Sequence, residues 1–359
     1  MPPAPRALGS AAGLLLRTLA VPAGLTLVVA CGGGSSASAQ HSTAPRSAAP
    51  TASRTARARA ASQTVAEPPA MVAVTSRGAL VVLSRATGAP NRTLVPSGVL
   101  GDEISASPDG RTVYFSRRHG CTDDVESVPV TGGPPALIST GSMPAVSPDG
   151  ATLAFARQPS LTPHCTPNTA NLSAQFNLVV RTLGSGVERV YPMLPAGQSS
   201  GLPAPISHLS WAPNSTLLAV SIASIQDNEG WQIVLMDTTT AQDYLGGTGD
   251  TSVPVTGSGR RRSYWREGVF MPDGGLFVSR ACCAGVPVRN TSKLMWEVST
   301  TGAFRHLVAI GFPGLQHISL AANHSGNWLL YLAGGDLYVS YRGARPRQLG
   351  GGLIAAAWI

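Results

Sequence analysis

Short apolar runs recur along residues 70–359, and a few small or polar residues separate each run from the next. Runs such as Leu178–Val180 and Leu217–Val220 are continuously apolar and lack the alternation of a half-exposed strand. Short continuous runs bounded by turn residues are typical of strands that are buried on both faces. The pattern therefore predicts a protein built from many short strands.

A recurring turn motif joins pairs of these strands. Ser107–Phe115 (SPDGRTVYF) is followed 40 residues later by Ser147–Phe155 (SPDGATLAF). In such a turn Pro presets φ, Asp or Asn bonds back to the backbone, and Gly takes the position with positive φ. We therefore expect a tight hairpin between a strand that ends near Ser107 and one that begins near Thr112. Weaker copies of the motif begin at Ala212, Met271 and Asn323.

A second motif, an apolar strand that ends in a turn of small residues, occurs six times, at 80–88, 128–133, 178–186, 233–238, 294–302 and 337–343. Each unit then contains four strands, A to D, with the proline turn between A and B. The first unit lacks strand A, because Met71–Val74 corresponds to strand B. The apolar run Leu353–Ile359 is comparable to the A strand at Ile206–Trp211, so we expect it to complete the first unit.

This repeat over residues 70–359 resembles that of the TolB-like β-propellers. The resemblance implies an all-β fold, a six-bladed β-propeller of four-stranded antiparallel blades closed by the C-terminal strand. Closure of the ring removes the exposed sheet edges that would otherwise invite aggregation. A shared fold does not determine function, so the resemblance assigns no activity.

The first 30 residues read as an export signal. Residues 1–17 carry two arginines and no acid, and residues 18–30 form an apolar run that is shorter than the roughly 20 residues of a bilayer span. Val28–Cys31 (VVAC), followed by three glycines, resembles the bacterial lipobox. The resemblance implies that Cys31 is acylated, with palmitate among its chains, and becomes the first residue. The alternative is an ordinary signal peptide cleaved near Ala30 or Ala39.

Composition separates the remaining segments. Residues 31–69 are rich in Ser, Ala, Thr, Pro and Arg, and so few large apolar side chains predict a disordered tether. Only 12% of all residues are charged, while 40 are Gly and 29 are Pro, which favours an all-β domain over 70–359. The formal net charge is +8 with a single lysine, Lys293. We attribute the arginine bias to a GC-rich, actinobacterial coding sequence, and the dispersed charge predicts no nucleic-acid partner.

Four cysteines besides Cys31 follow predicted B strands, at positions Cys121, Cys165, Cys282 and Cys283. All four are therefore expected in B–C loops at one rim, and an exported protein is expected to oxidise them. We predict a Cys121–Cys165 bridge between adjacent blades, among three possible pairings. Zinc held by His119, Cys121, His164 and Cys165 is the alternative, but the spacing matches no standard zinc motif. No metal or cofactor is expected.

Polar residues near the starts of A strands are candidates for the mouth of the central channel. These are Asp102, Glu103, His208, Arg266, Glu267 and His317. Such a mouth could hold a ligand or a cation, although isolated polar residues at a solvated opening are the commoner explanation. No catalytic residue is assigned.

Together these features predict a membrane-anchored, extracytoplasmic β-propeller that serves as a protein-interaction or ligand-binding module. We expect a monomer that is held to the membrane by its lipid and binds an envelope protein or a small ligand. An extracytoplasmic hydrolase or lyase with its site at the channel mouth is the alternative. Converging acids and histidines in the channel would favour the enzyme.

Overall fold

The computed structural model describes the following parts of the chain: 67–101, 103–157, 177–192, 206–222, 232–240, 245, 250–253, 263–282, 294–310, 318–342 and 344–359. These residues form strands and turns without a helix, so none of them builds a helix long and apolar enough to cross a membrane. The predicted signal peptide, Cys31 and the tether up to residue 66 lie outside the described residues.

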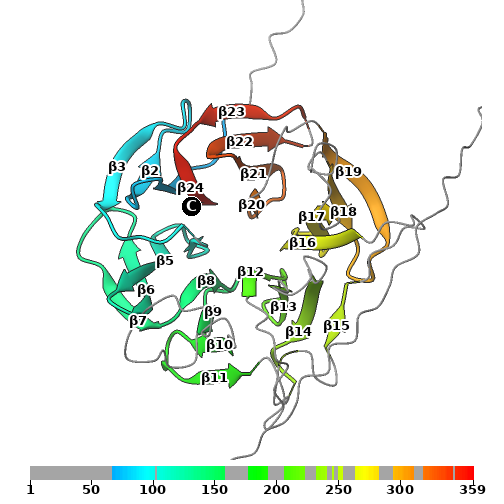
Figure 1. The fold of residues 1–359 in the computed structure, drawn as a ribbon, viewed down its shortest axis with the longest axis horizontal. Coiled ribbons are helices and arrows are strands. Elements are labelled where there is room, and N and C mark those ends of the chain that lie inside the picture. The colour runs from blue at the N-terminus through cyan, green and yellow to red at the C-terminus, as the bar shows by residue number, and fades with distance from the viewer. Residues whose placement is uncertain are drawn as a thin grey trace, which may run out of the picture. The chain divides into compact units, whose positions relative to one another are not determined.

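The described residues form six four-stranded antiparallel sheets, which confirm the predicted six-bladed β-propeller. Figure 1 shows the sheets arranged around a central axis. Blade 1 contains, from the inside outward, β24 (Leu353–Trp358), β1 (Met71–Thr75), β2 (Leu80–Leu83) and β3 (Pro90–Val95). Blade 2 contains β4 (Ser105–Ala106), β5 (Thr112–His119), β6 (Thr122–Pro129) and β7 (Ala136–Thr140). Blade 3 contains β8 (Ser142–Val146), β9 (Thr152–Arg157), β10 (Asn177–Thr182) and β11 (Glu188–Tyr191).

The other three blades follow the same order. Blade 4 contains β12 (Ile206–Trp211), β13 (Leu217–Ile222), β14 (Gln232–Asp237) and β15 (Thr251–Ser252). Blade 5 contains β16 (Ser263–Phe270), β17 (Leu276–Cys282), β18 (Leu294–Val298) and β19 (Phe304–Ile310). Blade 6 contains β20 (Ile318–Ala322), β21 (Trp328–Ala333), β22 (Asp336–Tyr341) and β23 (Arg347–Gly350).

The C-terminal strand closes the ring as predicted. β24 pairs antiparallel with β1, with Met71 opposite Trp358 and Val74 opposite Ala355. In Figure 1 the red β24 completes the blue blade that contains β2 and β3. The first and last strands of the propeller therefore belong to one sheet.

The proline turns have the predicted hairpin geometry. The Asp109 carboxylate accepts hydrogen bonds from the Ser107 hydroxyl and from the Arg111 backbone N–H, and Gly110 has a φ of 67°. The hydrogen bond from Ser107 is the main reason why the pKa of Asp109 lies below its usual range. The third blade repeats this turn with Ser147, Asp149 and Gly150. The turn aspartates are therefore explained by hydrogen bonds within the turn, from a serine hydroxyl and from the backbone.

The hydrophobic core lies between the blades. Among the described residues, buried apolar side chains form six clusters, and each cluster joins two neighbouring blades. The cluster between blades 2 and 3, for example, contains Tyr114, Val125, Leu153, Phe155 and Val179. Strands buried on both faces explain the continuous apolar runs, since neither face is available for polar residues.

Candidate functional site

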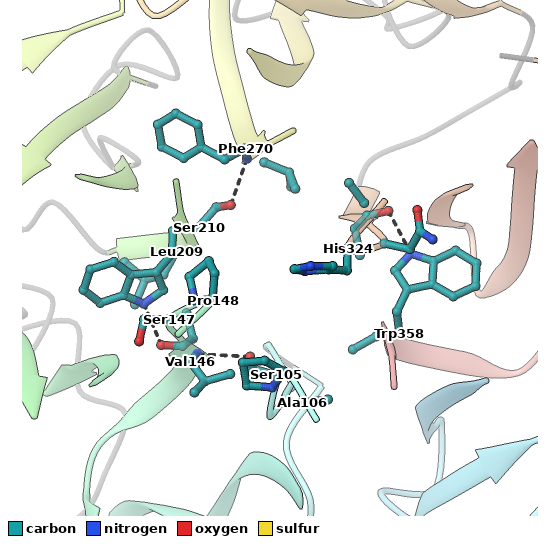
Figure 2. A pocket seen from close by; sticks show the side chains of 18 of the residues that line it. Ser105, Ala106, Val146, Ser147, Pro148, Leu209, Ser210, Phe270, His324 and Trp358 are labelled. Carbon is teal, nitrogen blue, oxygen red and sulfur yellow. Dashed lines mark hydrogen bonds between the residues drawn. The ribbon is translucent and has the colours of Figure 1, made fainter. Parts of the chain in front are cut away.

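A cavity of about 580 Å³ occupies the centre of the propeller. Residues from the innermost strands, or from the segments beside them, line it in all six blades. Figure 2 shows side chains from several blades converging on this space, including Ser105, Pro148, Ser210, His324 and Trp358. Its volume lies in the range of ordinary small-molecule sites, about 300–1,000 Å³.

The cavity opens at the end of the A–B turns. The turn prolines Pro108, Pro213 and Pro272 are exposed, and all three line the cavity. Glu103 and His208 also line it, but they lie further from the turns along the chain and are largely or fully buried. Glu103 and His208 therefore line the cavity away from the A–B turns, where both side chains are largely shielded from solvent.

The two inner side chains contact each other across the propeller. Glu103 Oε2 accepts a hydrogen bond of 3.0 Å from the Leu209 backbone N–H. The same oxygen lies 3.6 Å from His208 Nδ1. Glu103 precedes β4 of blade 2, and His208 belongs to β12 of blade 4, so this contact joins two blades that are not consecutive in the ring. This pair brings one acid and one histidine of the candidate residues into contact.

Burial lowers the pKa of His208 from 6.5 to about 4, although the nearby Glu103 carboxylate attracts a proton. Between these two pH values the unfolded chain therefore binds a proton that the folded protein does not. We expect this imbalance to lower the free energy of unfolding by roughly 3 kcal/mol as the pH falls from about 6.5 to about 4. Urea denaturation across this window should show a shallower decline in His208→Gln than in the wild type. If the free energy of unfolding fell equally with pH in both proteins, buried His208 would not be the cause of the decline.

Hydrogen bonds between blades hold the cavity wall. The hydroxyl oxygen of Ser105 accepts from the Val146 N–H at 3.1 Å, and that of Ser210 accepts from the Phe270 N–H at 2.9 Å. The indole N–H of Trp211 donates to the Ala145 carbonyl at 2.9 Å. These bonds, drawn in Figure 2, join neighbouring blades. They hold neighbouring parts of the wall together and engage the polar side-chain atoms of Ser105, Ser210 and Trp211.

His324 also lines the cavity, and sequence reasoning missed it. It is exposed, and Figure 2 shows its ring extending into the central space. His324 occupies the position that the turn motif gives to proline in blades 2 to 5. The signal was therefore available, because the motif copy at 323–326 departs from the others at this position.

The other predicted channel residues have different positions. Glu267 is buried in β16 and is absent from the residues that line the cavity. Arg266 also belongs to β16, but its side chain lies outside the described part of the protein. Asp102 and His317 lie outside the described residues. Of the six candidate channel residues, Glu103 and His208 are the two that the described structure shows in contact.

The structure describes two of the four predicted disulfide cysteines, Cys121 and Cys282. Cys121 lies in the turn between β5 and β6 and is disulfide-bonded. Cys165 and Cys283 lie outside the described residues, so the Cys121–Cys165 pairing stays a prediction. Cys282 is the last residue of β17, opposite Ser263, so its expected place in a B–C loop was wrong. His119 Nε2 lies 2.8 Å from Glu126 Oε1, and the described residues contain no metal-binding group of three His, Cys, Asp or Glu side chains.

No protein-family model and no curated protein matches this chain. Among solved structures, TolB from Acinetobacter baumannii shares 14% identity and a TM-score of 0.55, over 80% of this chain and 65% of that chain. TolB from Agrobacterium tumefaciens shares 15% identity and a TM-score of 0.49, over 81% and 93%. A nidogen/laminin complex shares 10% identity and a TM-score of 0.51, over 80% and 97%. This chain thus spans about two thirds of the A. baumannii TolB, and the fold is that of a TolB-like six-bladed β-propeller.

Proposed function

We propose that this chain is a lipid-anchored protein at the outer face of the cytoplasmic membrane, and that its propeller is a binding module. Its ligand is a segment of an envelope protein that enters the central cavity at the A–B turns. The observation that carries this proposal is the cavity itself, which exposed prolines of the A–B turns border and which residues of all six blades line.

The chemistry of the lining favours binding over catalysis. The described wall is dominated by proline, alanine and larger apolar side chains, which suit burial of an apolar segment. A hydrolase or lyase would require a nucleophile or several titratable groups that converge on one point. Glu103 and His208 form one such contact, but among the described residues no group of three His, Cys, Asp or Glu side chains is found.

One similar structure agrees with a role in protein interaction, because it is a complex of nidogen and laminin. It shares 10% identity with this chain, so it supports the suitability of the fold and specifies no partner.

The anchor is tested at Cys31. In the Cys31→Ala variant the acylated sulfur is absent, and we expect the protein to leave the membrane fraction for the medium or to remain unprocessed. Stable anchoring requires about two acyl chains, so loss of the modified residue should have a complete effect. Fractionation and intact-mass measurement would read this out. Normal processing with full membrane retention would exclude acylation at this residue.

The cavity is tested by filling it. Ala106 is half-buried and lines the cavity, as Figure 2 shows, so the Ala106→Phe side chain should occupy part of the space. We expect crosslinking in intact cells to capture a discrete envelope protein with the wild type. Its yield should fall at least about tenfold with Ala106→Phe, because the segment can no longer enter.

Ala136→Phe is the matched control, since Ala136 is exposed on the outer strand β7. It should capture the partner as well as the wild type does, and both variants should keep the wild-type melting temperature. Equal capture by all three proteins would refute binding in the cavity. Loss of capture with Ala136→Phe alone would move the interaction to the outer strands.

A further inference from the structure

The turns around the cavity share one position at which blade 6 differs. Proline occupies this position in four blades, at Pro108, Pro148, Pro213 and Pro272, and all four line the cavity. Blade 6 has His324 instead, with its ring directed into the cavity (Figure 2). Among the described residues, these turn positions at the rim are therefore apolar in blades 2 to 5 and carry an imidazole in blade 6.

The turn of blade 6 does not use this imidazole. The Asn323 carboxamide oxygen accepts from the Trp328 N–H at 2.9 Å, and its NH₂ donates to Ser325 Oγ at 2.9 Å. The Gly326 N–H donates to the Asn323 carbonyl at 2.8 Å. Since Asn323 and Gly326 complete the turn, and proline serves in the same position elsewhere, the fold has no need for a histidine here.

Other polar side chains of the lining are engaged within the protein. The hydroxyls of Ser107 and Ser147 donate to their turn aspartates, and those of Ser105 and Ser210 accept backbone N–H groups. Trp358 Nε1 donates to the Ala321 carbonyl at 3.3 Å, and Glu103 accepts from Leu209. Within the described part of the chain, His324 forms no hydrogen bond and no ion pair. An imidazole carries a donor in every protonation state, so His324 can bind a ligand without breaking a bond in the wall.

We propose that His324 determines the specificity of the cavity by donating a hydrogen bond to an oxygen acceptor of the bound segment. The ligand class is a short peptide segment with apolar side chains that face the prolines and a carbonyl or carboxylate oxygen that reaches His324. This inference rests on the proposed function, because it names the recognition chemistry of the same cavity.

The internal repeat provides a substitution that tests the role of His324. His324→Pro restores the residue of the other four turns and removes the imidazole, so the variant should fold like the wild type. His324→Gln retains an N–H donor. The probe is a random hexapeptide library, prepared once with free C-terminal carboxylates and once with C-terminal amides. It is selected on the full-length wild-type protein and then measured on each variant.

Selected peptides should lose binding to Ala106→Phe, bind His324→Pro at least about fivefold more weakly, and bind His324→Gln within about twofold of the wild type. Enrichment from the carboxylate library alone assigns the acceptor to the terminal carboxylate. Enrichment from both libraries assigns it to a carbonyl or to a side-chain carboxylate.

Two results would overturn the inference and leave the proposed function intact. One is peptides that require an unfilled cavity and bind His324→Pro as tightly as the wild type. The other is a loss with His324→Gln as large as that with His324→Pro, which would exclude hydrogen-bond donation. If no selected peptide distinguishes the wild type from Ala106→Phe, the cavity takes no peptide, and the proposed function fails together with the inference.

Discussion

Deletion of residues 353–359 is expected to unfold or aggregate the propeller. β24 pairs with β1 along its length, and Leu353, Ala355 and Ala356 are buried in the two clusters that flank blade 1. Removal exposes the inner edge of β1 and uncovers apolar faces on two neighbouring blades. Full burial of one large apolar side chain is worth about 1.5–3 kcal/mol, and a whole domain has a net stability of only about 5–15 kcal/mol. Circular dichroism and size-exclusion chromatography would detect the loss.

A second deletion serves as its control. Removal of residues 35–65, within the predicted tether, should leave the melting temperature of the propeller unchanged. A protein without residues 353–359 that remained soluble, monomeric and equally heat-stable would show that β24 is dispensable, and ring closure would have to be abandoned.

The second large effect is expected at Phe155. Its ring is fully buried between blades 2 and 3, where it packs with Tyr114, Val125 and Val179. Phe155→Ala removes these contacts and leaves a cavity in a rigid interface, which typically costs about 3–5 kcal/mol. Urea denaturation should therefore show a much lower free energy of unfolding with little change in the denaturant slope.

Leu137→Ala is the control for this substitution, because Leu137 in β7 is 65% exposed. It should change the free energy of unfolding by less than about 0.5 kcal/mol. Similar small losses at both positions would mean that the interface between blades 2 and 3 is not tightly packed.

The fold was predictable because its determinants are local and repeated. The proline, aspartate and glycine of the 107–110 turn each act on their own backbone, so two clear copies identified the unit and weaker copies located the other blades. Ring closure was inferred because the first unit lacked an A strand and the apolar run Leu353–Ile359 had no unit of its own. Their pairing joins positions as distant as Met71 and Trp358, and the sequence indicated it only through this mismatch in number.

The site was less predictable, because the orientation of inner-strand side chains depends on bulges. The register shifts between Ile206 and His208 in β12, and again between Trp265 and Glu267 in β16. One extra residue turns every following side chain to the other face. This explains why proximity to the start of strand A did not tell which polar residues line the cavity. His324 was not predicted to line the cavity, because the motif at 323–326 was interpreted only as a turn.

The central claim is that ligands enter the cavity through the end formed by the A–B turns. Hydrogen–deuterium exchange of the full chain, with and without a crosslinked or copurified partner, tests it most directly. We predict slower exchange in the turns at 107–110, 147–150, 212–215 and 323–326 when the partner is bound, with no change in the outer strands β7 and β11. Protection confined to the outer strands, with unchanged exchange in these turns, would contradict the account.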